Sequence, residues 1–184
     1  CSGTGTNITF SGTPNATVAY TINGGANQSI ILDGSGTATV ATGNLTVNTT
    51  YALVSVQDTV TTCSQSQTGS AVVSINALPT ATISGATAVC SGTGTNITFS
   101  GTPNATVTYT VNGGANQTVV LNGTATARLA TGNLTTTATY ALVSVQDTVT
   151  TCSQSQTGTA VVSINALPTA TIAGTTAICS GTGT

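Results

Sequence analysis

The side chains of this sequence that are best suited to covalent chemistry are five cysteines. They stand at positions 1, 63, 90, 152 and 179, separated alternately by 62 and 27 residues. The chain has no His to complete a zinc site, and no two cysteines form a Cys-x-x-Cys motif. We therefore expect disulfide bonds, formed in an oxidising extracellular compartment, at Cys1, Cys63, Cys90, Cys152 and Cys179.

The sequence contains few of the residues that other kinds of reactive site need. The sequence holds one Arg, no Lys, no His and three acidic residues, and only 2% of its residues are charged. A general base, a phosphate-binding patch and a nucleic-acid interface all need side chains that are missing here. No run approaches the roughly 20 apolar residues that span a bilayer. We expect no enzymatic activity, no cofactor, no metal, no nucleic-acid partner and no membrane span in this segment.

An internal repeat organises the whole sequence. Cys1–Thr6 returns as Cys90–Thr95 and again as Cys179–Thr184, with a period of 89 residues. Residues 1–89 and 90–178 are identical at 72 of 89 positions. Two copies and the start of a third, without a distinct cap, predict a window of a longer tandem array.

Only one of the acidic positions of the first copy is also acidic in the second copy. Asp33 becomes Asn122 in the second copy, whereas Asp58 and Asp147 occupy equivalent positions. One retained acid per copy is neither a catalytic carboxylate pair nor a calcium site. The retained Asp precedes Thr59 or Thr148 and an aliphatic residue, and an Asp in this position commonly begins a loop.

Composition and turn signals predict an all-β fold. Thr makes up about a quarter of the chain, and Thr, Val and Ile favour strands over helices. Turn-forming pairs such as Asn23-Gly24 and Asp33-Gly34 separate short apolar runs and suit tight hairpins. The runs expected to form strands in the first copy are Asn7–Phe10, Ala16–Ile22, Ser29–Leu32, Thr37–Ala41, Thr50–Val56 and Ser70–Ile75. A period of 89 residues fits an immunoglobulin-like β-sandwich better than a solenoid or a propeller.

The expected module boundaries follow from proline. Pro79 and Pro168 follow the last strand of each copy and cannot lie in a central strand. We therefore predict a module lacking its first strand at 1–79, a complete module at 80–168, and the start of a third at 169–184. The short, proline-containing junctions indicate a stiff string of modules.

These boundaries suggest how the cysteines pair. A bond between Cys90 and Cys152 would lie within the module 80–168, and Cys1 with Cys63 would be its equivalent. A bond between Cys63 and Cys90 would instead join neighbouring modules, and the sequence does not exclude it. Cys179 is the odd cysteine, left over where the window ends.

Several runs carry a family resemblance over essentially the whole chain. They are Val89–Thr93, Asn96–Pro103, Val107–Gly114, Tyr140–Val145 and the late Cys152. They resemble the PKD-like, immunoglobulin-like repeats of very large surface proteins in Bacteroidota. The resemblance implies export by the type IX secretion system and a role in cell-surface adhesins or filaments, some of them in gliding motility.

The same resemblance implies a modification. In that phylum an Asp-Ser/Thr-aliphatic triplet is an O-glycosylation acceptor, and residues 58–60 and 147–149 match it. It therefore predicts O-linked glycan on Thr59 and Thr148.

The resulting expectation is a structural repeat region, the stalk or fibre of an extracellular bacterial adhesin or surface filament. Its partners would be neighbouring repeats, other copies of the fibre or surface glycans. Two alternatives remain open at this point. One is a fibre subunit that polymerises by strand exchange. The other is a glycan- or ice-binding module that uses threonine rows such as Thr37-Ala38-Thr39, a row that Arg128 interrupts in the second copy.

Overall fold

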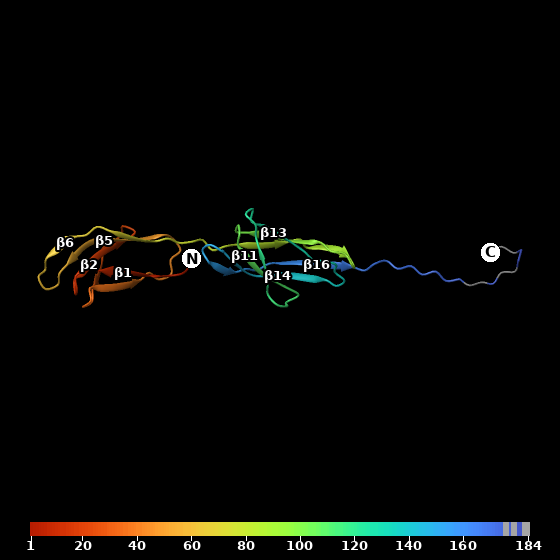
Figure 1. Ribbon diagram of the computed structural model, residues 1–184, viewed down its shortest axis with the longest axis horizontal. Coiled ribbons are helices and arrows are strands. Elements are labelled where there is room, and N and C mark those ends of the chain that lie inside the picture. The colour runs from red at the N-terminus through yellow and green to blue at the C-terminus, as the bar shows by residue number, and fades with distance from the viewer. Residues whose placement is uncertain (175–176, 178–179, 182–184) are drawn as a thin grey trace. The chain divides into compact units, whose positions relative to one another are not determined.

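A computed structural model shows an all-β chain, as the composition predicts (Figure 1). The structure describes residues 1–174, 177 and 180–181. Within these residues it contains β-strands, mostly in antiparallel sheets, and no helix.

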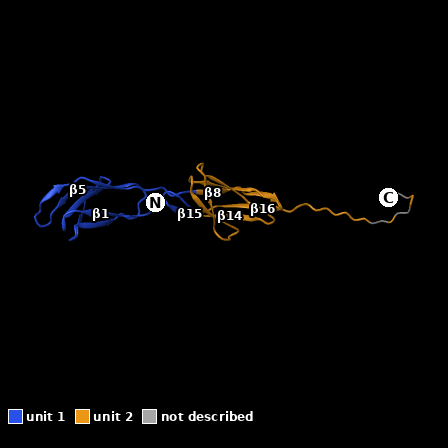
Figure 2. Ribbon diagram, in the orientation of Figure 1, with its two compact units in different colours: residues 1–80, 145–154 blue, residues 81–144, 155–184 orange. Residues whose placement is uncertain are grey.

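The chain divides into two compact units (Figure 2). Unit 1 comprises Cys1–Thr80 together with Val145–Gln154, and unit 2 comprises Ala81–Ser144 and Ser155–Thr184. Unit 1 thus includes a ten-residue segment that belongs, by sequence, to the second repeat.

The first repeat forms seven strands in two sheets. One sheet pairs β1 with β4, and the other has the order β3-β2-β5-β6, with β7 also pairing β5. The long strand β5 is therefore the centre of the larger sheet. The strands are β1 (Asn7–Ser11), β2 (Thr17–Ile22), β3 (Gln28–Ile31), β4 (Thr37–Ala41), β5 (Thr49–Gln57), β6 (Ser64–Ser66) and β7 (Ser70–Val73).

The core of unit 1 lies around a small aromatic cluster. The Phe10 and Tyr20 ring centroids are 4.8 Å apart, and Tyr20 lies 6.4 Å from Tyr51. Leu32 and Val18 complete the buried set. Buried positions alternate with partly buried ones along β2, so every second side chain points into this core.

Residues 81–165 form nine strands in two sheets, of orders β13-β10-β8 and β12-β11-β14-β16-β9, with β15 also pairing β14. Strand β9 runs parallel to β16, whereas β10 pairs antiparallel with β13 and β8, β11 with β12, and β14 with β16. The strands are β8 (Ala81–Ser84), β9 (Thr87–Cys90), β10 (Asn96–Gly101), β11 (Thr106–Val111), β12 (Gln117–Val120), β13 (Thr126–Ala130), β14 (Ala138–Gln146), β15 (Ser153–Ser155) and β16 (Thr159–Asn165). The core includes Phe99, 5.0 Å from the ring of Tyr109, with Ile97, Val107 and Leu121.

The expected strands of the first repeat are present, with ends that differ by at most two residues and with Thr37–Ala41 matched at both ends. The short strand β6 was not predicted, because Ser64–Ser66 has no apolar residue to mark it. The turn at Asn23-Gly24 has positive φ at both residues, as predicted. The expected tight hairpin at Asp33-Gly34 is not formed, because β3 and β4 lie in different sheets, and the positive φ of the turn that connects them falls at Gly36.

Candidate functional site

The most distinctive chemical feature of the structure is a disulfide bond between Cys1 and Cys152. Their Cα atoms are 5.5 Å apart, and 151 positions separate them in the sequence. Cys1 belongs to the first repeat, and Cys152 lies in the segment of the second repeat that forms part of unit 1. Cys152 is completely buried. The bond therefore ties one repeat covalently to the next.

This pairing corrects the predicted pairs Cys1–Cys63 and Cys90–Cys152. Among the described residues, Cys63 and Cys90 are exposed thiols. Cys179 lies outside the described residues. Neither the predicted bonds within a module nor the alternative Cys63–Cys90 bond is formed.

The positions of Cys1 and Cys63 in unit 1 explain why these two cysteines do not form a disulfide. Ser2 follows Cys1 and donates its N–H to the carbonyl of Asn76, which lies beyond the end of β7 and therefore beside the start of β5. Cys63 lies past the other end of β5, where its carbonyl accepts the Asp58 N–H at 2.9 Å. A nine-residue strand is roughly 30 Å long. A disulfide needs Cα atoms within about 7 Å, so Cys63 at one end of β5 is too far from Cys1 at the other end to bond it.

The turn that carries Cys1 recurs at Cys90 with the same geometry. The Thr4 hydroxyl donates to the Cys1 carbonyl at 2.7 Å, and the Thr93 hydroxyl donates to the Cys90 carbonyl at 2.7 Å. Gly3, in the first of these turns, has φ of 81°, and the equivalent Gly92 has φ of 83°. We call Cys1 and Cys90 first-type cysteines.

The loop that carries Cys152 recurs at Cys63. The Asp147 N–H donates to the Cys152 carbonyl at 2.9 Å, the same distance as between Asp58 and Cys63. In both loops the cysteine N–H lies 3.4 Å from the hydroxyl of the threonine two residues before it. We call Cys63 and Cys152 second-type cysteines. The loop geometry is therefore the same whether or not the thiol is bonded.

The acid that both repeats retain shapes this loop. Asp58 Oδ1 accepts the N–H groups of Val60 and Thr61, both at 2.8 Å. Asp147 Oδ1 makes the corresponding bonds, at 2.8 and 2.7 Å. These backbone bonds to the charged form lower the pKa of both carboxyls, whose residues are partly exposed. The sequence signal for a loop-starting Asp was present, and its consequence is a shaped loop that presents the second-type cysteine.

A further hydrogen bond fixes the same loop of the second repeat. The side-chain amide of Gln154 donates to the Pro79 carbonyl at 2.6 Å, within unit 1. Pro79 is fully buried. The junction proline, the loop and the disulfide are thus parts of one local structure.

The predicted glycan acceptors lie on these loops. Thr59 is exposed, and its hydroxyl donates to the Asn15 carbonyl at 3.0 Å. Thr148 is also exposed. Both side chains are therefore at the surface.

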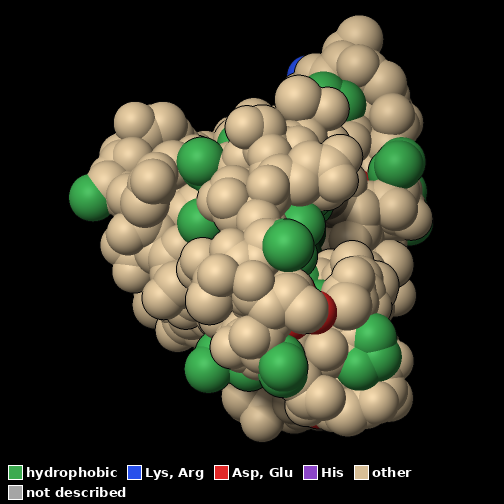
Figure 3. Space-filling view, turned by 90° about the vertical axis from the view of Figure 1, so that its left-hand side faces the viewer, with side chains coloured by type: hydrophobic (Ala, Val, Ile, Leu, Met, Phe, Trp, Pro, Cys, Tyr) green, Lys and Arg blue, Asp and Glu red, His purple; other side chains and the backbone are tan. Residues whose placement is uncertain are grey.

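The described residues hold no group of three or more His, Cys, Asp or Glu side chains that could bind a metal ion. In that same part of the chain no helix has the length and apolar character to cross a membrane. The face drawn in Figure 3 is dominated by uncharged polar side chains and backbone, with hydrophobic atoms in small separate groups.

The chain was also compared with known proteins. No protein-family model matches it, and no curated protein matches it.

Proposed function

We propose that this chain is a structural repeat region, the stalk or fibre of an extracellular bacterial adhesin or surface filament built from PKD-like, immunoglobulin-like modules. The observation that supports this most directly is the Cys1–Cys152 bond. A disulfide that joins successive repeats resists their separation under tension, which is what a stalk requires. Disulfides also favour an oxidising compartment outside the cytoplasm.

The disulfide pattern extends naturally along a tandem array. A first-type cysteine bonds the second-type cysteine of the following repeat, as Cys1 bonds Cys152. By the same rule Cys90 bonds a cysteine of a following repeat, and Cys63 bonds one of a preceding repeat. The matching turn and loop geometries of the bonded and free cysteines support this extension.

The near absence of charge fits the same role. The chain has a formal net charge of −2 and one basic residue. Its surface contacts are mainly those of hydroxyls and amides, and their strength depends little on salt. A stalk that meets changing external conditions benefits from this property.

Pulling experiments on single molecules test the mechanical role. With handles at both ends, the oxidised chain is expected to extend only through residues 153–184, because the 151-position loop is closed by the disulfide. Reduction should add roughly 500 Å of extension, at about 3.4 Å per residue. Cys1→Ser is the matched control and should behave as the reduced chain. Full extension of the oxidised chain would contradict the role.

Exposure on the cell is tested separately. Antibodies against residues 1–168 should label intact cells of the source organism, and labelling only after lysis would contradict a surface location.

Glycosylation of Thr59 and Thr148 belongs to the same proposal, since it follows from the family resemblance. Intact mass of the native protein should exceed the sequence mass, and Thr59→Ala with Thr148→Ala should remove the excess. Native protein with bare hydroxyls at both positions would contradict it.

A further inference from the structure

The loop that carries Cys152 holds the backbone of that cysteine on both sides. The Cys152 carbonyl accepts the N–H of Asp147 at 2.9 Å, and the Cys152 N–H donates to the Thr150 hydroxyl at 3.4 Å. Asp147 Oδ1 in turn accepts the N–H of Thr150 at 2.7 Å. The backbone of the cysteine is therefore tied to Asp147 both directly and through Thr150.

The residue directly before this cysteine has an unfavourable backbone conformation. Thr151 has φ of 57°, in the left-handed region, which a β-branched residue adopts only where surrounding contacts hold it. Its hydroxyl donates to the Thr150 carbonyl at 2.7 Å, and its carbonyl accepts the side-chain amide of Gln146 at 3.5 Å. The turn of the chain at Thr151 sets the direction in which Cys152 leaves the loop.

The equivalent loop shows that this conformation does not need the disulfide. Thr62, the residue before Cys63, has φ of 59°, and its carbonyl accepts the side-chain amide of Gln57 at 3.2 Å. Cys63 is a thiol in this structure, whereas Cys152 is bonded. Since the unfavourable φ is nearly the same in both loops, the loop itself produces it, and the S–S bond does not.

A loop that forms before the bond makes the bond easier to form. Closing a disulfide on a flexible segment is opposed by the entropy that the segment loses, whereas a preformed segment has already lost that entropy. Holding Cys152 in place therefore raises the effective concentration of its thiol at Cys1.

This effect accounts for which acid the two repeats share. Asp58 and Asp147 stand five residues before Cys63 and Cys152, and each accepts two N–H groups of its loop. Asp33, the acid that the second repeat lacks, lies in a turn without a cysteine. The acid is thus present in both repeats where a cysteine follows it.

We propose that Asp147 is a positioning residue for the Cys1–Cys152 disulfide, holding Cys152 in place before the two sulfurs bond. The oxidant is a small-molecule disulfide such as oxidised glutathione. The two cysteine thiols lose two electrons and two protons and form one S–S bond, while the S–S bond of glutathione takes up both and becomes two thiols. The inference concerns the bond that the structure shows and does not depend on the role as a stalk.

Equilibration with glutathione tests this role. In a background of Cys63→Ser, Cys90→Ser and Cys179→Ser, Cys1 and Cys152 are the only thiols. Alkylation and mass spectrometry at set ratios of reduced to oxidised glutathione give the equilibrium constant for closing the bond. Recombinant protein of the sequence mass is used, so that no glycan contributes.

Substitutions of the acid should change this constant selectively. Asp147→Ala should lower it about tenfold, because the loop loses both bonds that the carboxylate accepts. Asp147→Asn should restore it to within about threefold of the Asp147 chain, since an amide oxygen accepts such bonds, as Asn122 Oδ1 does from the Thr124 and Thr126 N–H groups.

Asp58→Ala is the matched control, because it makes the same change in the equivalent loop, whose position 63 is Ser in this background. It should leave the constant within about twofold, since that loop lies at the far end of β5 from Cys1. Equal effects of Asp58→Ala and Asp147→Ala would reflect general destabilisation of the protein and would overturn the proposal.

Thr151→Gly tests whether the loop forms before the bond. Glycine adopts the left-handed conformation without strain. Because the strain is present with and without the bond, its removal should change the constant by less than about threefold. If the bond instead forced the loop into this conformation, Thr151→Gly would favour closure by about tenfold, and that result would overturn the proposal.

Discussion

Asp33 and Asn122 occupy equivalent positions in the two repeats and organise the same turn. Asp33 accepts the N–H and hydroxyl groups of the residues two and four positions later, at 2.6 to 3.1 Å. Asn122 accepts the corresponding four groups through its amide oxygen, at 2.7 to 3.3 Å. The substitution keeps the acceptor and removes the charge.

The first prediction concerns pH. Hydrogen bonds, led by the Ser35 hydroxyl, lower the pKa of Asp33 to about 2 from 3.8. A carboxyl with a depressed pKa in the folded state stabilises it above the unfolded pKa, and this stabilisation is lost as pH falls from about 4 to 2. Asp33→Asn should therefore reduce the fall in the urea unfolding midpoint that occurs as the pH is lowered from about 4 to 2. Asp58 and Asp147, whose pKa values are also lowered, account for the remainder.

The converse substitution is the control for this prediction. Asn122→Asp should add acid dependence to the second repeat, measured by hydrogen exchange of its own peptides between pH 2 and 5. An unchanged profile for both variants would contradict the assigned role of the turn.

The second prediction exploits the single basic residue. Trypsin cleaves the denatured chain only after Arg128, which lies between Cys1 and Cys152. Without reduction the two fragments should remain joined and migrate as one species. Cys1→Ser should release them, whereas Cys90→Ser should not. Release by Cys90→Ser would instead support a bond between Cys90 and Cys152.

The third prediction concerns backbone conformation. Ala125 has φ of 63°, and the equivalent Gly36 has φ of 77°. A side chain in this region is strained by about 1 kcal/mol. Ala125→Gly should stabilise the second repeat by about that amount, and Gly36→Ala should destabilise the first by at least as much. Urea unfolding followed by hydrogen exchange separates the two repeats, and a destabilising Ala125→Gly would refute the account.

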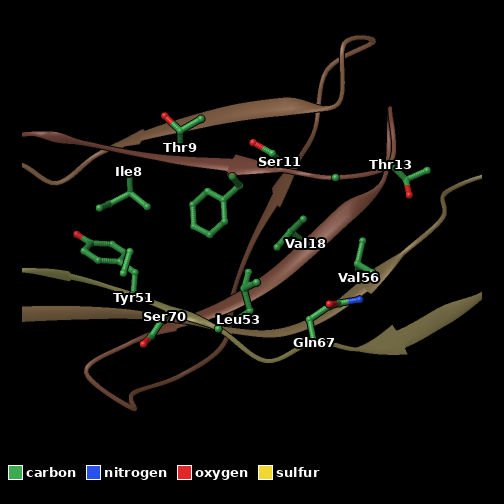
Figure 4. Close-up of a pocket in the computed structure, with 14 residues that line it drawn as sticks. Ile8, Thr9, Ser11, Thr13, Val18, Tyr51, Leu53, Val56, Gln67 and Ser70 are labelled. Carbon is green, nitrogen blue, oxygen red and sulfur yellow. The ribbon is translucent and has the colours of Figure 1, made fainter.

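The fourth prediction compares two phenylalanines. Phe99→Ala should cost about 5 kcal/mol, because the ring is fully enclosed and its loss leaves a cavity. Phe10→Ala should cost nearer 3 kcal/mol, because Phe10 is 7% exposed and lines the cavity drawn in Figure 4. Equal costs would contradict this difference in how completely the two rings are enclosed.

Some of these structural features could be predicted from the sequence, and others could not. The strands were predictable because turn residues such as Asn23 and Gly24 separate runs of strand-forming residues. The bond partner of Cys1 was not, because spacing along the chain does not reveal that Cys63 lies at the far end of β5. Asp58 and Asp147 were recognised as loop residues, but their bonds to two backbone N–H groups depend on a conformation that the sequence does not specify.

The separation of Cys1 and Cys152 also constrains the order of events during biosynthesis. At 5 to 20 residues per second, about 8 to 30 s pass between the emergence of the two cysteines. Cys63 and Cys90 emerge first and are the nearer competitors for Cys1. Once the first repeat folds, strand β5 holds Cys63 roughly 30 Å from Cys1. Folding of each repeat before oxidation therefore protects Cys1 from Cys63 until the next repeat arrives, and it makes a catalyst of disulfide exchange unnecessary for excluding that pair.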